Sequence, residues 1–480
     1  MDQQFMFVDG RKTDRASKKL VRRHVMKGKN AGKKVLRPTR LALQDARKQI
    51  NSATMDEREP LWACNDLKKR HQRSDWIYLS EKMAALAFGN VLLPFALPVP
   101  VTPLAMDIMN TFFTNIGQRI YPPRLGLDLQ DFKLAWCRLL FSDVDAYNCS
   151  ILLMSSSNEF FLGNGHSSPK ALYNQSHMFH AVNERLQGEN AISNSTIAIV
   201  LSLIHHEQIK NEQSSAAVHN RGLEMLIRLR GGLHKLEADG NILLIMKVCK
   251  TDILFSLQHG GETMFFRDSM SAVRNALATK GLILDGMAAA ESAPRSSELD
   301  PYLREALQDM MAVCLLFNNG LRNRTLDYLL FLEIIVSLFY RLIWFHPLKN
   351  TNKETSVDNV YHVGMLAFMS TMLVQRGPRR IIKCQMISKT VEEAVQRRLP
   401  SVDDELAFWL MYMGAIWSDK GPDGEWIGVK IRNTATRLGV ESWGKARDCL
   451  RRFPWIDALH DEPGLEVWNR VNGQDRAVEI

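Results

Sequence analysis

The stretch from residue 177 to residue 259 constrains the fold of this chain most strongly. Its apolar residues recur every three or four positions, and turn residues interrupt them at regular intervals. This spacing is typical of amphipathic helices, which must bury their apolar sides against each other or against neighbouring helices. The stretch therefore predicts the helical core of a globular domain and by itself indicates no chemistry.

The helix boundaries within this core follow from capping residues. One helix is predicted to begin at Asn194 or Ser195, both good N-cap residues, and to end at the polar run 211–215. A second is predicted to end at Gly231-Gly232, where glycine can adopt a left-handed conformation. A third continues from Ile242. The apolar residues expected to face the core are Ile197, Val200, Leu201, Ile204, Ile209, Val218, Leu223, Leu226, Ile227, Leu229, Ile245, Met246, Cys249, Ile253 and Leu257.

Helical patterns fill most of the remaining chain, and no alternating run typical of a strand occurs. We therefore predict an all-α protein with a large multi-helix body. Residues 155–168, rich in serine and glycine, predict a surface loop. Further helices are predicted at residues 107–121, 129–148, 268–278, 301–318, 328–345, 361–375, 389–399, 403–417 and 443–453.

Three regions precede or divide this body. Residues 1–50 predict a basic arm, disordered when free, because they offer too little apolar surface to bury. Residues 51–103 contain tryptophans and then four prolines, which predicts a connector. The body is expected to span residues 104–480, with a candidate internal linker at 284–298.

Positive charge is concentrated in the arm. Between Arg11 and Arg40 thirteen Lys or Arg residues accompany one acid, whereas the chain from Leu41 onward carries a net charge of −1. Clustered cations predict a nuclear-import signal, a phosphate-contacting segment, or both; a merely solvated tail is the alternative. No aromatic or paired amide is placed there to recognise bases. The predicted contact residues are Arg11, Lys12, Lys18, Lys19, Arg22, Arg23, Lys27, Lys29, Lys33 and Lys34.

Cysteine spacing argues against a disulfide framework or a structural metal site. The seven cysteines are scattered, and no two lie within ten residues of each other, which fits reduced, buried thiols in the nucleus or cytosol. Two histidine groups are candidate metal ligands, namely His177 and His180 with Glu184, and His205, His206 and Glu207 with His219. Neither matches a metalloenzyme motif, so we expect helix-junction hydrogen bonds and no metal or other cofactor.

Motifs for catalysis and for membrane insertion are not evident. No GxSxG, Walker or GxGxxG motif occurs, which predicts that the protein is not an enzyme. The longest apolar run, residues 328–345, contains Glu333 and Arg341 and therefore predicts a buried helix rather than a membrane span. Arg228 and Arg230 are expected to bond carbonyls at the end of their helix, with an anion or effector contact as the alternative.

Several segments resemble the fungal-specific transcription-factor-like proteins. They are HAVNERLQGENAISNSTIAIVLSLIHHEQ, HNRGLEMLIRLRGGLHKL and KTDILFSLQ in the core, PFALPVPVTPLAMDIMNTFF before it, and FMFVDGRKTDRASKKLVRRHVMKGKNAGKK at the start. They are spread, in the family's order, over residues 5–258, roughly half of the chain. The resemblance implies a helical regulatory region. Relatives that read DNA carry a zinc cluster, and this sequence lacks the paired cysteines that such a cluster needs.

The resemblance and the charge pattern together predict a nuclear regulator of transcription. It is expected to act through contacts with transcriptional or other regulatory proteins, with the arm supplying import and weak, non-specific DNA affinity and with no membrane role. Two alternatives stay open: a cytosolic helical interaction protein, and an all-α enzyme. An enzyme is expected to show an apolar pocket with convergent polar side chains.

Overall fold

The computed structural model describes residues 97–114, 125, 127–128, 130–162, 169–321, 324–348, 356–373, 384–397, 403–417 and 425–473. These residues are 78% helical and 1% in strands, which confirms the all-α prediction. The arm (1–50) and most of the connector (51–103) lie outside the described residues.

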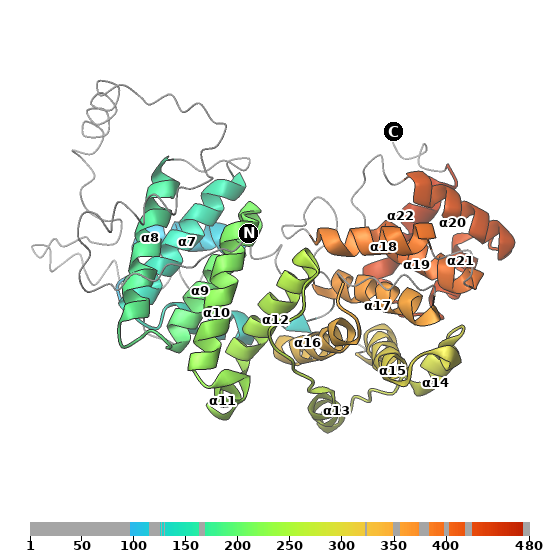
Figure 1. The fold of residues 1–480 in the computed structure, drawn as a ribbon, viewed down its shortest axis with the longest axis horizontal. Coiled ribbons are helices and arrows are strands. Elements are labelled where there is room, and N and C mark those ends of the chain that lie inside the picture. The colour runs from blue at the N-terminus through green and yellow to red at the C-terminus, as the bar shows by residue number, and fades with distance from the viewer. Residues whose placement is uncertain are drawn as a thin grey trace, which may run out of the picture. The chain divides into compact units, whose positions relative to one another are not determined.

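The first half of the body extends from α4 to α12 and includes the core predicted at residues 177–259 (Figure 1). They are α4 (Pro103–Phe112), α6 (Gln130–Leu140), α7 (Val144–Leu162), α8 (Pro169–Gln187), α9 (Asn194–Lys210), α10 (Gln213–Leu229), α11 (Gly232–Ala238) and α12 (Ile242–His259).

The second half continues the helical architecture to residue 471. Its elements are α13 (Met270–Thr279), α14 (Met287–Glu291), the short η2 (Ser296–Glu298), α15 (Pro301–Leu315), the π-helical turn η3 (Leu316–Gly320), α16 (Tyr328–Phe345), α17 (Val357–Leu373), α18 (Gln385–Arg397), α19 (Asp404–Trp417), α20 (Glu425–Arg437), α21 (Trp443–Leu450) and α22 (Asp457–Val471).

The central helices form where the sequence predicts them, although their burial differs from simple amphipathic stripes. The Ser193 side chain caps α9 by accepting from the Thr196 N–H, and α9 is buried on all sides over residues 195–201. On α10, by contrast, Val218 and Leu229 are 55% and 66% exposed. The prediction that these two residues face the core is wrong, because α10 packs mainly on α9 and its outer side has no neighbouring helix among the described residues.

Helix α12 joins the two halves of the body. It packs against α6 and α9 on one side and against α16 and α18 on the other. Almost every residue from Leu244 to Leu257 is buried as a result. Figure 1 shows α12 between the α7–α10 group and the helices that follow it.

Helix α7 corrects the prediction of a surface loop at 155–168. The helix runs through Leu162, and Ser156, Ser157 and Asn158 are buried. Serine is tolerated inside this helix because its hydroxyl finds partners: Ser157 Oγ lies 2.8 Å from His206 Nδ1 on α9. Residues 163–168 lie outside the described part of the chain.

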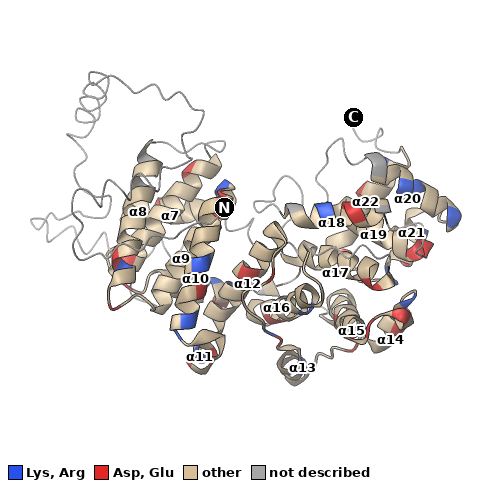
Figure 2. Cartoon of the chain, in the orientation of Figure 1, with Lys and Arg blue, Asp and Glu red and all other residues tan. Residues whose placement is uncertain are grey.

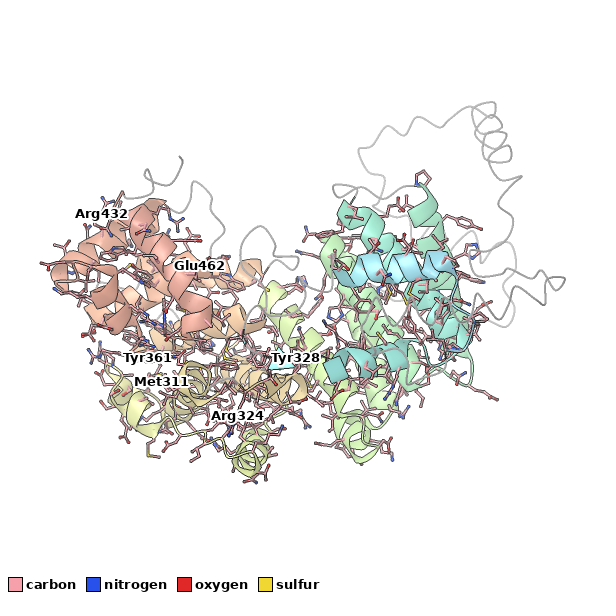
Figure 3. All side chains as sticks on the ribbon, turned by 180° about the vertical axis from the view of Figure 1, so that it is seen from behind. Met311, Arg324, Tyr328, Tyr361, Arg432 and Glu462 are labelled. Atoms are coloured by element: carbon pink, nitrogen blue, oxygen red, sulfur yellow. The ribbon has the colours of Figure 1, made fainter. Side chains whose placement is uncertain are left out.

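Helix α16 is the most apolar helix that the structure describes. It is long and apolar enough to cross a membrane, but 72% of it is buried inside the protein, as expected for a core helix. Its first residue, Tyr328, packs edge-on against Phe132 of α6 with ring centroids 4.5 Å apart (Figure 3). Glu333 and Arg341 both form ion pairs, so the two charges of α16 are compensated.

A close helix contact organises the core of the second half. Gly364 of α17 faces the indole of Trp409 on α19, so that a Cβ at this position would lie only 2.3 Å from the ring. The Trp409 ring stacks on Phe453 at 5.2 Å, and its Nε1–H donates to the Pro454 carbonyl. Tyr361, one turn before Gly364, donates its hydroxyl hydrogen to the Pro294 carbonyl (Figure 3).

The candidate linker 284–298 contains short helices rather than an extended connector. Helix α14 and η2 lie in it, and Ala290, Ala293 and Ser296 are buried. A Cβ at Gly286 would lie 2.1 Å from the Gln308 carbonyl oxygen, so the backbone of this segment touches the backbone of α15.

Two short strands connect distant parts of the chain. Strand β1 (Leu127–Asp128), just before α6, pairs in parallel with β2 (Leu326–Asp327), just before α16. Asp327 also caps α16 by accepting from the Leu330 N–H. The pairing therefore fixes the starts of α6 and α16 beside each other.

The glycine pair after α10 allows a stability prediction. Gly231 and Gly232 have φ values of 96° and 82°, which confirms the predicted left-handed turn. Gly231→Val should lower the free energy of unfolding by about 1–3 kcal/mol, because a β-branched residue is strained at positive φ and would crowd Lys235. Urea denaturation measures the change.

Gly222 provides the matched control. It lies within α10, where nothing comes within 4 Å of an added Cβ. Gly222→Ala should raise stability by about 0.4–1 kcal/mol, because alanine restricts the unfolded chain. Equal effects of the two substitutions would contradict the assignment of the strained turn to Gly231.

Candidate functional site

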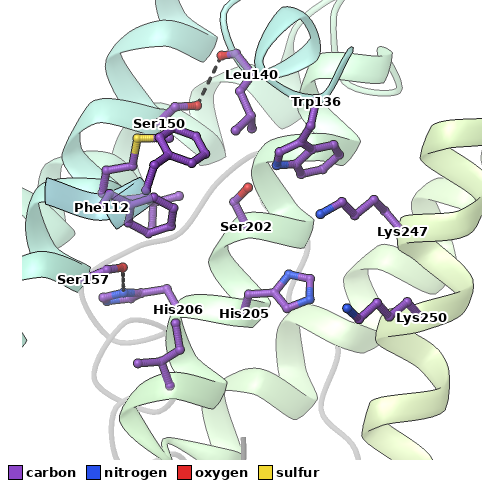
Figure 4. A pocket seen from close by; sticks show the side chains of 14 residues that line it. Phe112, Trp136, Leu140, Ser150, Ser157, Ser202, His205, His206, Lys247 and Lys250 are labelled. Carbon is purple, nitrogen blue, oxygen red and sulfur yellow. Dashed lines mark hydrogen bonds between the residues drawn. The ribbon is translucent and has the colours of Figure 1, made fainter. Parts of the chain in front are cut away.

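A cavity of about 80 Å³ lies among five helices of the first half, and we call it the lysine cavity (Figure 4). Its walls are mainly apolar: Phe112 and Phe113 come from the end of α4, Trp136 from α6, and Leu153 from α7. Helix α9 contributes Ser202, His205, His206 and Ile209, and α12 contributes Lys247 and Lys250. An apolar cavity with a few convergent polar groups is the usual form of a small-molecule site.

Two buried ammonium groups give the lysine cavity its polarity. Lys247 and Lys250 are only 8% and 6% exposed, and their three-residue spacing on α12 places both on one side of the helix. Figure 4 shows both side chains extending from α12 towards Trp136, Ser202 and His205. Lys247 Nζ lies 4.4 Å from the Trp136 ring centroid and 4.8 Å from that of Phe132. Neither ammonium group has a hydrogen-bond or carboxylate partner among the described residues.

Burial strongly perturbs the titration of these lysines. Burial lowers the pKa of Lys247 to about 7, and repulsion from Lys250 is the next cause. Burial also lowers the pKa of Lys250 to about 8. A buried ammonium group loses its hydration, so its neutral form is favoured unless an anion compensates the charge. At neutral pH a substantial fraction of Lys247 is therefore an unprotonated amine.

Other buried charged side chains in the described regions have an opposite charge or hydrogen-bond donors as partners, which sets the two lysines apart. Arg185 forms two hydrogen bonds to Asp143, and Arg341 contacts Asp309 at 2.6 Å. On the opposite side of α12, Asp252 accepts hydrogen bonds from two backbone N–H groups and from the Tyr340 hydroxyl. Figure 2 shows Lys and Arg interspersed with Asp and Glu along the described helices.

The remaining polar groups around the lysine cavity already have partners. Ser150 donates to the Ala146 carbonyl at 2.7 Å, and Ser202 donates to the Ala198 carbonyl at 2.9 Å. Ser157 is bonded to His206. His205 donates from Nδ1 to the Leu201 carbonyl at 2.8 Å. The two ammonium groups are thus the donors in the cavity that lack an acceptor among the described residues.

The two histidines of the cavity are neutral. Burial, and after it the positive charges of Lys247 and Lys250, lowers the pKa of His205 to about 3. Burial, followed by the charge of Lys210, lowers the pKa of His206 to about 4. Lys247 and Lys250 are consequently the groups of the cavity that exchange protons near physiological pH.

Neither of the two candidate histidine groups forms a metal-binding site within the described residues. His180 pairs with Glu184 at 3.2 Å on the surface of α8, while His177 contacts Tyr173. Glu207 is buried and contacts His219 at 2.8 Å, whereas His205 and His206 turn to other partners. Within the described ranges, no three His, Cys, Asp or Glu side chains form a group that could hold a metal ion.

Arg228 and Arg230 also have structural partners. Arg228 pairs with Glu224 one turn earlier on α10. Arg230 donates to the Ile192 carbonyl at 2.6 Å, in the turn before α9. The prediction that it bonds carbonyls at the end of its own helix is therefore wrong. The ten Lys and Arg residues of the arm that were predicted to give import or phosphate contact lie outside the described residues.

Sequence reasoning missed the lysine cavity, although one signal was present. Lys247 and Lys250 interrupt the apolar run ILLIMKVCKTDILF, and two lysines on one side of a buried helix are costly without a compensating ligand. The walls come from helices distant in sequence, which no local pattern reveals. Comparisons of the chain with protein-family models, with curated proteins and with solved structures gave no match.

Proposed function

We propose that the protein is a nuclear regulator of transcription that acts through protein contacts of its helical body. The observation that carries this proposal is the charge distribution: a net +12 between Arg11 and Arg40, against −1 from Leu41 onward. A short basic segment attached to a nearly neutral helical body is typical of proteins that need access to the nucleus or to polyanions. The resemblance to fungal transcription-factor-like proteins supports the same function.

The helical body suits a regulatory role because one helix contacts both of its halves. Helix α12 carries Lys247 and Lys250 on the side facing the lysine cavity and packs on α16 and α18 with its other side. A change on the cavity side can therefore alter the packing of the second half. Regulatory proteins that contact the second half would then sense the state of the first half.

The arm can be tested separately from the body. A fluorescent fusion of residues 1–50 should accumulate in nuclei, and replacing Lys18, Lys19, Arg22 and Arg23 with glutamine should return it to the cytoplasm. The charge-preserving exchange of each of the four, Lys for Arg and Arg for Lys, is the matched control and should keep the fusion nuclear. Fluorescence microscopy measures the nuclear-to-cytoplasmic ratio.

A cytoplasmic intact fusion would contradict the nuclear assignment and favour a cytosolic interaction protein. DNA binding by the arm should be weak, with dissociation constants of about 10⁻⁴–10⁻⁶ M at physiological salt, and should weaken steeply with added salt. Tight, sequence-selective binding by the full chain would place a DNA reader in the helical body.

A second candidate function is an all-helical enzyme, and the lysine cavity is the specific observation in its favour. An amine that is partly unprotonated in an apolar cavity can add to a carbonyl carbon, as catalytic lysines do. Turnover of a small molecule in a metabolite mixture, followed by mass spectrometry and abolished by Lys247→Met, would favour this candidate over the regulator.

A further inference from the structure

The lysine cavity has the composition of a ligand site whose ligand carries one negative group. Lys247 and Lys250 are more than nine-tenths buried and extend into the cavity, and neither has an acceptor among the described residues. Two neighbouring cations without a counter-charge are unfavourable in a low-dielectric interior. A bound anion between them would offset their repulsion and accept hydrogen bonds from both ammonium groups.

The supply of donors limits the kind of anion. The hydroxyls of Ser150 and Ser202 donate to backbone carbonyls, and the Nδ1–H of His205 does the same. The free donors are therefore the N–H groups of two ammonium ions. Both lysines come from α12, so their N–H groups can meet the two oxygens of a carboxylate, whereas phosphate oxygens turned towards the apolar walls would find no donor there.

Size and wall chemistry limit the rest of the ligand. A dry cavity of about 150 Å³ lined by apolar side chains binds benzene, so a cavity of about 80 Å³ fits roughly three or four non-hydrogen atoms, the carboxylate included. Phe112, Phe113, Leu153 and Ile209 provide a wall that gains from contact with methyl and methylene groups rather than with hydroxyls.

We propose that the lysine cavity is a binding site for a short aliphatic monocarboxylate. The carboxylate contacts the Lys247 and Lys250 ammonium groups, and the carbon chain lies against the apolar walls. The assignment is independent of nuclear localisation, because it rests on the cavity alone. It also requires no turnover, since binding a carboxylate between two ammonium groups is complete without a reaction.

Binding should be linked to protonation of the lysines. The charge of Lys250 on α12 lowers the pKa of Lys247, and Cys137 on α6 raises it. His205 on α9 is neutral, and Lys133 acts on Cys137. Burial lowers the pKa of Lys247 to about 7, so the unliganded amine loses its proton above neutral pH. The affinity for a carboxylate should therefore fall by up to about tenfold per pH unit above pH 7.

The experiment compares a carboxylate with its neutral isostere on the full chain. Saturation-transfer NMR of the methyl signal should show that acetate binds at least about tenfold more tightly than acetamide at pH 6.5, because only the acid pairs with the ammonium groups. Lys247→Met and Lys250→Met should each weaken binding of the acid at least about tenfold. Lys235→Met is the matched control and should not change it, because Lys235 is exposed and pairs with Asp239.

Three results would overturn the proposal. Equal affinity for the acid and the amide would show that charge does not determine binding. Unchanged affinity in both cavity variants would place the ligand elsewhere on the protein. Displacement of bound acetate by inorganic phosphate at a lower concentration than by propionate would assign the cavity to a different class of anion.

Discussion

Lys247→Met should raise the free energy of unfolding by about 1–4 kcal/mol, the range seen when apolar residues of similar volume replace a buried ion pair. The reason is that Lys247 is 8% exposed and has no acceptor for its ammonium group among the described residues. Methionine keeps the length of the side chain and removes both the desolvated charge and its repulsion from Lys250. Urea denaturation followed by circular dichroism measures the gain.

The pH dependence of this gain has a definite sign. Burial lowers the pKa of Lys247 from 10.5 to about 7 in the folded protein, so between these pH values the unfolded chain binds more protons than the folded one. The wild-type protein should therefore gain stability from this group as pH rises from 7 to 10.5. The advantage of Lys247→Met should be largest below pH 7 and should disappear near pH 10.5.

Lys235→Met is again the control, and it should change stability by no more than about 0.5 kcal/mol because the side chain is exposed. A loss of stability in Lys247→Met would mean that the ammonium group has a partner in solution that stabilises the fold. A gain in stability would also show that loss of carboxylate binding by Lys247→Met is not caused by misfolding, because this variant would be more stable than the wild type.

Trp409→Ala should lower the free energy of unfolding by about 3–5 kcal/mol, the range for removing a large aromatic side chain from a core. Trp409 is fully buried, stacks on Phe453, and donates to the Pro454 carbonyl. It also fills the space left by Gly364 on α17, so its removal leaves a cavity that the helices cannot easily close. Thermal and urea denaturation measure the loss.

Trp344 offers a control of the same residue type. It is 65% exposed, and its ring meets Phe266 edge-on at 5.0 Å. Trp344→Ala should cost at most about 1.5 kcal/mol, the upper value for one aromatic pair. Equal losses in the two variants would show that the α17–α19 contact does not determine the stability of the second half.

Periodicity and capping residues predicted most of the helices well, because both act locally. Asp403, for example, was expected to begin a helix, and its carboxylate accepts from the Glu405 N–H at the start of α19. The missed helices have weaker local signals. Helix α22 contains Pro463, and α20 has only a thin apolar side with Ile427 and Ile431 buried.

The errors arose where tertiary partners override composition. The serines at 155–157 are common in loops, yet α7 continues through them, and His206 is a hydrogen-bond partner for the hydroxyls of Ser156 and Ser157. Val218 and Leu229 have helical spacing but lie on an outer surface, since spacing alone does not show which side of a helix has a neighbour. The lysine cavity needs five helices at once, so only its lysines could have been noticed in the sequence.

The pairing of β1 with β2 bears on the order in which the protein can fold during synthesis. Leu127 and Leu326 are about 200 residues apart, so the first strand leaves the ribosome long before its partner. Until then α12 has no α16 to cover its second side, where Ile245 and Val248 share a helix face with Asp252, the partner of Tyr340 on α16. The growing chain should therefore depend on chaperones over this interval, and fragments that end before residue 326 should aggregate rather than fold.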